Sequence, residues 1–271
     1  MVTTIGFPGL GIADFTVNPT AFTVLGRDIA WYGIIIAIGM VLAYLYAAHN
    51  MNKEGITTDD FLDIVIFTVP ISIVCARIFY VLFSLNEYDS FYEVIAIWNG
   101  GISILGAVIG GAITVTAVTK FKKISTFKAL DAISPAVLVG QVLGRWGNFI
   151  NAEVYGNATT LPWRMRISNA LVGTIEVHPL FLYESLWNFL GIVLIHFMYK
   201  KKKFDGQIFL CYVFWYSLIR SMLELMRSDT FILKTFGGLP ISFMLSVVAC
   251  VASLVILVIK SFKKNSKETQ I

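Results

Sequence analysis

Seven long apolar stretches constrain this 271-residue chain more than any other feature of its sequence. They cover about residues 31–50, 61–84, 101–119, 129–148, 179–199, 206–226 and 239–260. Each is close to the roughly 20 residues that a helix needs to cross about 30 Å of hydrocarbon. With 57% hydrophobic and only 14% charged residues, the chain carries more apolar side chains than a water-soluble core could cover. The pattern predicts an all-α integral membrane protein with seven transmembrane helices.

The lysines predict the orientation of these helices. They gather at Lys53, between 120 and 128, between 200 and 203 and between 260 and 267, which are alternate loops and the C-terminal tail, and Lys234 is the exception. Cytoplasmic loops are enriched in Lys and Arg, so the N-terminus is expected outside and the C-terminus in the cytoplasm. We interpret the lysine clusters as topology anchors rather than as a binding site for nucleic acid.

The loops are too short for a soluble domain, so we expect residues 1–271 to form a single polytopic membrane domain. It should carry an external N-terminal arm over about 1–30, an external loop over about 149–178 and a basic cytoplasmic tail over about 260–271. The external loop contains an alternating stretch at 163–167, which predicts one short hairpin.

The arginines are distributed differently from the lysines. At 1.5 Å per residue, Arg77, Arg145 and Arg220 each lie about 21 to 24 Å along a helix that starts at the cytoplasmic face. An arginine inside a membrane costs several kcal/mol and normally faces a cavity or a partner. We therefore expect the three guanidinium groups to meet at one depth in the outer half of the bilayer. Their planar fork suits two oxygens of a phosphate.

Acidic and amide side chains are expected at the same depth. Arg220, Glu224 and Arg227 are spaced i, i+4, i+7, so they share a helix face on which the carboxylate can orient both arginines. The other polar groups expected in this layer are Tyr32, Asn148, Asn151, Glu153, Tyr183 and Glu184. Taken singly, several of them fit an interfacial belt. Together they indicate a functional site, for which an anionic phospholipid of the outer leaflet is the natural ligand.

Six segments resemble the bacterial prolipoprotein diacylglyceryl transferases. They are WYG at 31–33, ARIFYV at 76–81, WNGGIS at 98–103, GRWGNFINAEVYG at 144–156, HPLFLYES at 178–185 and RSMLELMRSD at 220–229, of which the fourth is the most specific. The resemblance implies an enzyme of the bacterial cell membrane that moves the diacylglyceryl group of phosphatidylglycerol to the lipobox cysteine thiol of a prolipoprotein signal peptide. The products are a thioether and glycerol phosphate. It implies no metal and no soluble cofactor.

The same resemblance assigns roles to individual residues. The catalytic residues that it implies are Tyr32, Arg145, Asn148, Glu153, Gly156, Arg220 and Glu224. We expect Arg145, Arg220 and Arg77 to bind phosphatidylglycerol, with Asn151, Tyr183, Glu184 and Arg227 in support. The attacking thiol belongs to the substrate, so the chain's own Cys75, Cys211 and Cys250 need take no part.

One position departs from the family pattern. Members usually carry a histidine or tyrosine shortly after the glycine pair, whereas residues 100–107 read GGISILGA, with Leu105 at that place. Leucine cannot take a proton from the thiol. The alternatives are ionisation assisted by the arginines with Glu153 or Tyr32 as acceptor, His178 as base, or a catalytically impaired, lipid-binding paralogue. A transporter or flippase for lipid or an anionic solute is the remaining rival function.

Overall fold

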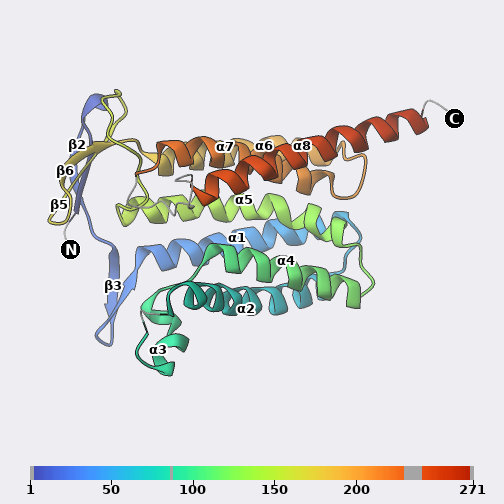
Figure 1. Ribbon diagram of the computed structural model, residues 1–271, viewed down its shortest axis with the longest axis horizontal. Helices are drawn as coiled ribbons and strands as arrows, with labels where there is room; N and C mark the ends of the chain where they lie inside the picture. Colours follow the sequence, from blue (N-terminus) through green and yellow to red (C-terminus); the bar gives the residue numbers. More distant parts are fainter. Residues whose placement is uncertain (1–2, 86–87, 229–239, 269–271) are drawn as a thin grey trace. The chain divides into compact units, whose positions relative to one another are not determined.

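The computed structural model describes residues 3–85, 88–228 and 240–268, and it is mostly helical (Figure 1). Within these residues, seven helices are long and apolar enough to cross a membrane. They are α1 (Trp31–Lys53), α2 (Thr58–Phe83), α4 (Ile104–Phe121), α5 (Thr126–Ile150), α6 (Leu180–Tyr199), α7 (Gln207–Met226) and α8 (Ile241–Glu268). The predicted seven-helix fold is confirmed, and the chain is a multi-pass membrane protein.

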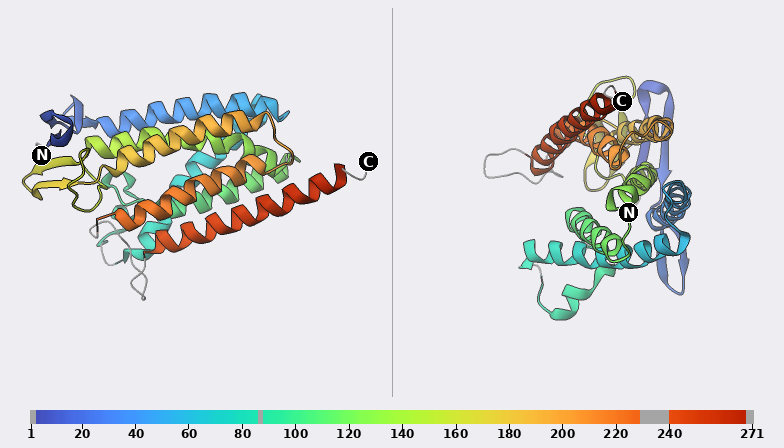
Figure 2. Two further views of the ribbon diagram at one scale, coloured as in Figure 1. Left: turned by 90° about the horizontal axis from the view of Figure 1, so that it is seen from above. Right: turned by 90° about the vertical axis from the view of Figure 1, so that its right-hand side faces the viewer.

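The chain divides into two compact units. The first comprises Met1–Ala47 and Ser134–Ile271 and includes α6, α7 and α8, which follow one another side by side in Figure 2. The second comprises Ala48–Ile133 and includes α2 packed on α4. The single membrane domain expected from the sequence stays a prediction.

Small residues let α4 approach α2 closely. A Cβ added at Gly106 would lie 2.5 Å from the carbonyl oxygen of Cys75, and one added at Gly110 would lie 2.6 Å from the Cβ of the same cysteine. Helices in lipid associate through such close packing, because lipid chains are as apolar as the side chains themselves. Large apolar side chains on the other faces remain exposed, among them Val108 of α4, as a lipid-facing surface requires.

The N-terminal arm and the loop between α5 and α6 form more β-structure than the sequence predicted. Strands β1 (Thr3–Phe7), β2 (Ile12–Val17), β5 (Met165–Asn169) and β6 (Gly173–Val177) form an antiparallel sheet in the order β2-β1-β5-β6. Strands β3 (Thr20–Val24) and β4 (Arg27–Ala30) form a separate antiparallel pair. The hairpin predicted within 149–178 is therefore present as β5 and β6. The strands of the N-terminal arm were not predicted.

The four-stranded sheet lies at the end of the first unit where α5 ends and α6 begins (Figures 1 and 2). Its buried side chains Ile5, Met165, Ile167 and Val177 pack with Phe181 from the first turn of α6. This small core fixes the N-terminal end of α6, and it therefore helps to position Glu184 one turn further along the helix.

Candidate active site

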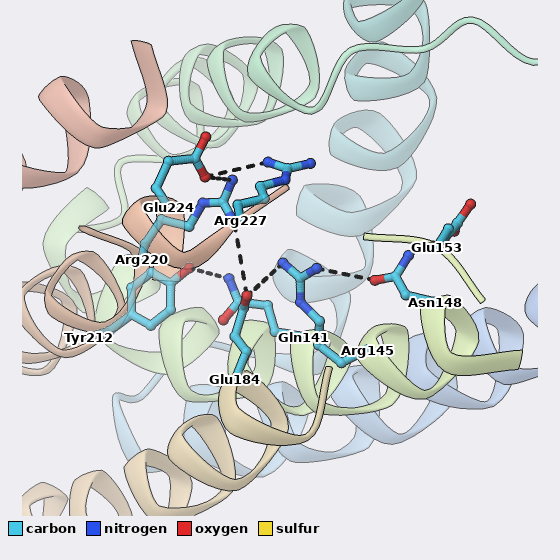
Figure 3. A network of polar contacts seen from close by, with 9 residues as sticks. All are labelled: Gln141, Arg145, Asn148, Glu153, Glu184, Tyr212, Arg220, Glu224 and Arg227. Carbon is cyan, nitrogen blue, oxygen red and sulfur yellow. Dashed lines mark hydrogen bonds and ion pairs between the residues drawn. The ribbon is translucent and has the colours of Figure 1, made fainter. Parts of the chain in front are cut away.

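Arg145 lies near the C-terminal end of α5, and its guanidinium group is held from two sides (Figure 3). Its Nη1 donates to Oδ1 of Asn148 at 3.1 Å, and its Nη2 lies 2.8 Å from the Glu184 carboxylate of α6. The arginine side chain is only 19% exposed. Charge-assisted bonds on both terminal nitrogens fix the plane of the fork.

Glu184 connects the arginines of two helices. Its side chain is 2% exposed, and one carboxylate oxygen lies 2.8 Å from Nη2 of Arg145 and 3.9 Å from Nη1 of Arg220. A carboxylate so deeply buried is tolerated only beside cations or donors. The sequence assigned Glu184 a supporting role, and the structure places it at the centre of the ionic cluster.

The predicted pattern of α7 is confirmed in its geometry. Arg220 Nη2 lies 2.7 Å from Oε2 of Glu224, and Arg227 Nη1 lies 3.4 Å from the same oxygen. Glu224 is 1% exposed, so its carboxylate faces both guanidinium groups from inside the protein. One carboxylate thus orients two arginines of the same helix, as the i, i+4, i+7 spacing predicted.

Three guanidinium groups therefore meet two carboxylates in the ionic cluster, which we define as Arg145, Glu184, Arg220, Glu224 and Arg227. Glu153 adjoins the cluster through Asn148, which bonds to both Arg145 and Glu153. Removing a charge from water is costly unless a counter-charge accompanies it. The gathered guanidinium groups are thus suited to an anion with two oxygens that their forks can hold.

Tryptophans clamp the helices that carry the cluster. Trp187 of α6 donates from Nε1 to the carbonyl oxygen of Trp215 at 3.1 Å, and Trp215 of α7 donates in return to that of Trp187 at 3.0 Å. Trp146 of α5 donates to the hydroxyl of Ser185 at 3.1 Å, next to Glu184. Bonds from side chains to neighbouring helices fix the axial positions of α5, α6 and α7, and hence the depth of their charged residues.

Glu153 is brought back towards Arg145 by a strained turn after α5. Asn148 Nδ2 donates to its carboxylate at 2.8 Å and Asn151 Nδ2 does so at 3.4 Å. The residues on either side, Ala152 and Val154, have φ of 50° and 57°. A positive φ is unusual for any residue with a side chain and especially for a β-branched one, and such strain is concentrated at functional sites. The Asn148, Asn151 and Glu153 group expected from the sequence is thus assembled.

Gly156 passes between two helix ends where no side chain fits. A Cβ there would lie 2.7 Å from the Cβ of His178 and 2.8 Å from the carbonyl oxygen of Met226. The Gly156 amide donates to the carbonyl oxygen of His178, and the next amide donates to that of Met226. The geometry gives Gly156 a positioning role, because it ties the loop after α5 to the start of α6 and the end of α7.

Two tyrosines of the expected site lie beside it. The ring of Tyr32 on α1 packs against Gly147 of α5, where an added Cβ would lie 2.5 Å from the ring. The hydroxyl of Tyr183 accepts from Trp163 Nε1 at 2.7 Å and lies 3.3 Å from Nδ1 of His178. Tyr183 and His178 thus form a polar layer at the N-terminal end of α6, next to Glu184. Burial holds the pKa of His178, which is outside the membrane-spanning segments, below its ordinary value.

Arg77 belongs to the second unit, and backbone carbonyl groups surround its guanidinium. Its nitrogens donate to the carbonyl oxygens of Glu93, Val94, Gly100 and Gly101 at 2.6 to 2.8 Å. Glu93 and Val94 lie in α3 (Phe91–Ile95), and the two glycines lead into α4. These bonds use four of the five N–H donors of an arginine. The geometry favours a structural role over the phosphate contact expected for Arg77, and its depth relative to Arg145 stays a prediction.

The sequence reasoning did not single out the polar residues beneath the cluster. Gln141 lies one turn before Arg145 on α5, and its Nε2 donates to the hydroxyl of Tyr212 on α7 at 3.1 Å (Figure 3). Tyr212, Tyr216 and Arg220 repeat every four residues on α7, with the two tyrosine rings stacked at 6.1 Å. This spacing was the available signal, because it places the tyrosines on the same helix face as Arg220.

The fold and the ionic cluster define a polytopic helical membrane protein with a buried, arginine-rich polar site. This chain belongs to the prolipoprotein diacylglyceryl transferase family, whose model matches residues 19–259. The resemblance found in the sequence is thereby confirmed.

Curated relatives are similar over nearly their whole length. A phosphatidylglycerol–prolipoprotein diacylglyceryl transferase of Limosilactobacillus reuteri is 41% identical over 256 residues, which cover 91% of this chain and 92% of the relative. The protein of the same name from Finegoldia magna is 40% identical over 252 residues, covering 92% and 98%. That of Clostridioides difficile is 38% identical over 247 residues, covering 90% and 96%.

Proposed function

We propose that this protein transfers the diacylglyceryl group of phosphatidylglycerol to the lipobox cysteine of a prolipoprotein signal peptide. The thiol loses its proton, and its sulfur forms a bond to the terminal glyceryl carbon that carries the phosphate. The carbon–oxygen bond to phosphate breaks, and glycerol phosphate leaves with the electron pair. Family membership and the names of the relatives support the reaction and favour it over a transporter.

The observation that carries this proposal is the convergence of Arg145, Arg220 and Arg227 from two helices on the buried carboxylates of Glu184 and Glu224. A phosphodiester lipid carries a negative charge and offers two oxygens that a guanidinium fork can hold. Charge on the leaving phosphate grows during the displacement. Fixed guanidinium groups in a site shielded from water stabilise that charge without having to reorganise.

We assign the main phosphate contact to Arg145. Asn148 and Glu184 hold its fork from two sides, so its remaining donors have a defined direction. Arg220 supplies the second contact, oriented by Glu224. Arg227 adds positive charge at the end of α7. In this arrangement the carboxylates position the arginines, and the arginines bind the lipid.

The substrate thiol needs a proton acceptor in place of the residue replaced by Leu105. We assign that role to Glu153 or Tyr32, which belong to the segments around Arg145. A thiol with a pKa of about 8.5 is already a few per cent ionised near pH 7, and neighbouring positive charge increases that fraction. Because of the positive charge of the arginines, a weaker base can therefore serve as the proton acceptor.

We also propose that the site opens to the outer leaflet of a bacterial cell membrane. The lysines at 120–128 lie where α4 ends and α5 begins, and those at 200–203 follow the end of α6, whereas Arg145 and Glu184 lie at the opposite ends of α5 and α6. Lysine-rich loops favour the cytoplasmic side. The N-terminus is then external, and the ionic cluster lies at the depth of the outer headgroups.

The proposed function is tested with purified protein, phosphatidylglycerol and a lipobox peptide. The expected result is a peptide heavier by one diacylglyceryl group, together with an equal amount of glycerol phosphate. A matched reaction with zwitterionic phosphatidylethanolamine should give far less product. Labelled lipid that crosses the membrane without a covalent product would support a transporter instead. Lipid binding with neither outcome would support an impaired paralogue.

A further inference from the structure

A buried amide beneath the ionic cluster lacks a partner. Asn188 of α6 is 0% exposed, and neither its Nδ2 nor its Oδ1 meets a hydrogen-bond partner among the residues that the structure describes. Rotating the amide by 180° would exchange its nitrogen and oxygen, but both atoms would still lack a partner among the described residues. Buried polar groups in folded proteins are nearly always hydrogen-bonded, so this one indicates a ligand.

A second amide is in the same situation. Gln141 of α5 uses Nε2 to bond to Tyr212, while its buried Oε1 has no partner in the described part of the chain. A tyrosine hydroxyl can donate as well as accept, so the assignment of the amide ends can be reversed. Either way, one end of Gln141 remains for a ligand.

Helical spacing places the two amides in one layer. On α5, Gln141 lies between Arg145 and Leu138, and on α6, Asn188 lies between Glu184 and Ile195. Arg145 contacts Glu184 above this layer, and Leu138 packs with Ile195 below it. Since α5 and α6 are in contact at both levels, their intervening residues face the same space. Figure 3 shows Gln141 and Tyr212 close to Glu184.

We propose that Gln141 and Asn188 form a hydroxyl-binding subsite beneath the ionic cluster. The layer offers amide oxygens that accept and an amide nitrogen that donates, and the amides themselves carry no charge. An O–H group, which donates and accepts at once, matches this set. Its source is either ordered water or the glycerol hydroxyls of a bound phosphatidylglycerol headgroup, and the second source rests on the proposed function.

The lipid source is tested by comparing phosphatidylglycerol with phosphatidylethanol, which keeps the phosphodiester charge and lacks the headgroup hydroxyls. If those hydroxyls occupy the subsite, the wild-type protein prefers phosphatidylglycerol about tenfold or more in kcat/KM, which corresponds to one charged or two neutral hydrogen bonds. Asn188→Leu, which is similar in size and apolar, should reduce that preference several-fold. Ile192→Leu, one turn further along α6, should leave it unchanged.

The water source is tested by thermal unfolding without any turnover. Replacing an unpaired buried amide with an apolar group of similar shape is neutral or stabilising, whereas replacing a hydrated one removes hydrogen bonds. A water-filled subsite therefore predicts a lower Tm for Asn188→Leu than for Ile192→Leu, with both lipids slowed equally. This measurement distinguishes failure of the subsite from failure of the transferase activity.

An unchanged lipid preference together with an equal or higher Tm for Asn188→Leu would overturn the subsite. If the variant does not fold, the wild-type protein provides the test. An experimental density map of the wild-type protein in phosphatidylglycerol should show an oxygen about 3 Å from the Asn188 amide. A map that shows no such oxygen beside the Asn188 amide would also overturn the subsite.

Discussion

Glu184 of α6 and Arg145 of α5 form an ion pair with a separation of 2.8 Å, although 39 residues separate them along the chain. The same carboxylate lies 3.9 Å from Arg220 of α7, so it couples the arginines of two helices. Glu184 thereby links the charged residues of α5 and α7, and the hydropathy of the sequence does not predict these contacts. The bonds between Trp187 and Trp215 fix α6 against α7, and the bond from Trp146 to Ser185 fixes α5 against α6.

Glu184→Gln should damage both stability and activity. The change leaves Arg145 and Arg220 without their shared counter-charge in a site where Glu184 is 2% exposed. Breaking a buried ion pair by removing one partner costs about 3 to 5 kcal/mol. Thermal unfolding in detergent measures the loss. Glu176→Gln, which removes a partly exposed carboxylate paired with Arg164 and Arg166, is the control and should unfold near the wild-type temperature.

Gly156→Ala should destabilise the protein by about 1 to 3 kcal/mol, the usual range for overpacking. The added methyl group would meet the Cβ of His178 at 2.7 Å and the carbonyl oxygen of Met226 at 2.8 Å. Gly140→Ala is the matched control, because an added Cβ there has nothing within 4 Å. In a helix interior that change should stabilise by about 0.5 to 1 kcal/mol. Equal effects of the two alanines on Tm would refute the positioning role of Gly156.

The stability of the protein should decrease as the pH falls below 6.5 because of His178. Burial lowers the pKa of this imidazole from its ordinary value of 6.5, so the unfolded chain takes up the proton first. The stabilisation is complete above the unfolded pKa and is lost as the pH falls through the folded one. Unfolding between pH 7.5 and 5 measures the slope. His178→Gln should flatten it, and an unchanged slope would show that other groups cause it.

Leu105→His should change turnover less than about threefold, since Glu153 or Tyr32 already accepts the proton in our proposal. A missing general base normally costs about 100-fold or more. A gain of that size in kcat would therefore show that Leu105 impairs the protein. Leu105→Asn is the control for polarity, because an amide cannot act as the base.

Much of the fold could be predicted because it depends on local sequence. Hydropathy located all seven spanning helices to within a few residues, and the spacing of Arg220, Glu224 and Arg227 identified their shared face. The strands of the N-terminal arm could not be found in this way. Strand β1 pairs with β5, so Ile5 meets Ile167 across more than half of the chain, and no local pattern encodes that pairing.

The sequence identified residues of the candidate site, but it predicted fewer of the contacts between them. Arg145 and Glu184 were both candidates, but their contact depends on how α5 crosses α6, which a sequence pattern does not specify. Arg77 shows the converse. Its depth suggested a contact to phosphate, yet α3 and the glycine pair before α4 each supply two backbone acceptors to its guanidinium.

The most direct test of the proposed lipid-binding role of the ionic cluster is the mass of a lipobox peptide after incubation with phosphatidylglycerol and Arg145→Lys protein. Lysine keeps the charge and loses the fork that Asn148 and Glu184 hold. We predict a fall in modified peptide of about 100-fold or more, as for loss of a donor to developing charge. Arg166→Lys, in a partly exposed pair with Glu176, should modify the peptide normally. Equal modification by both variants would contradict the role of Arg145.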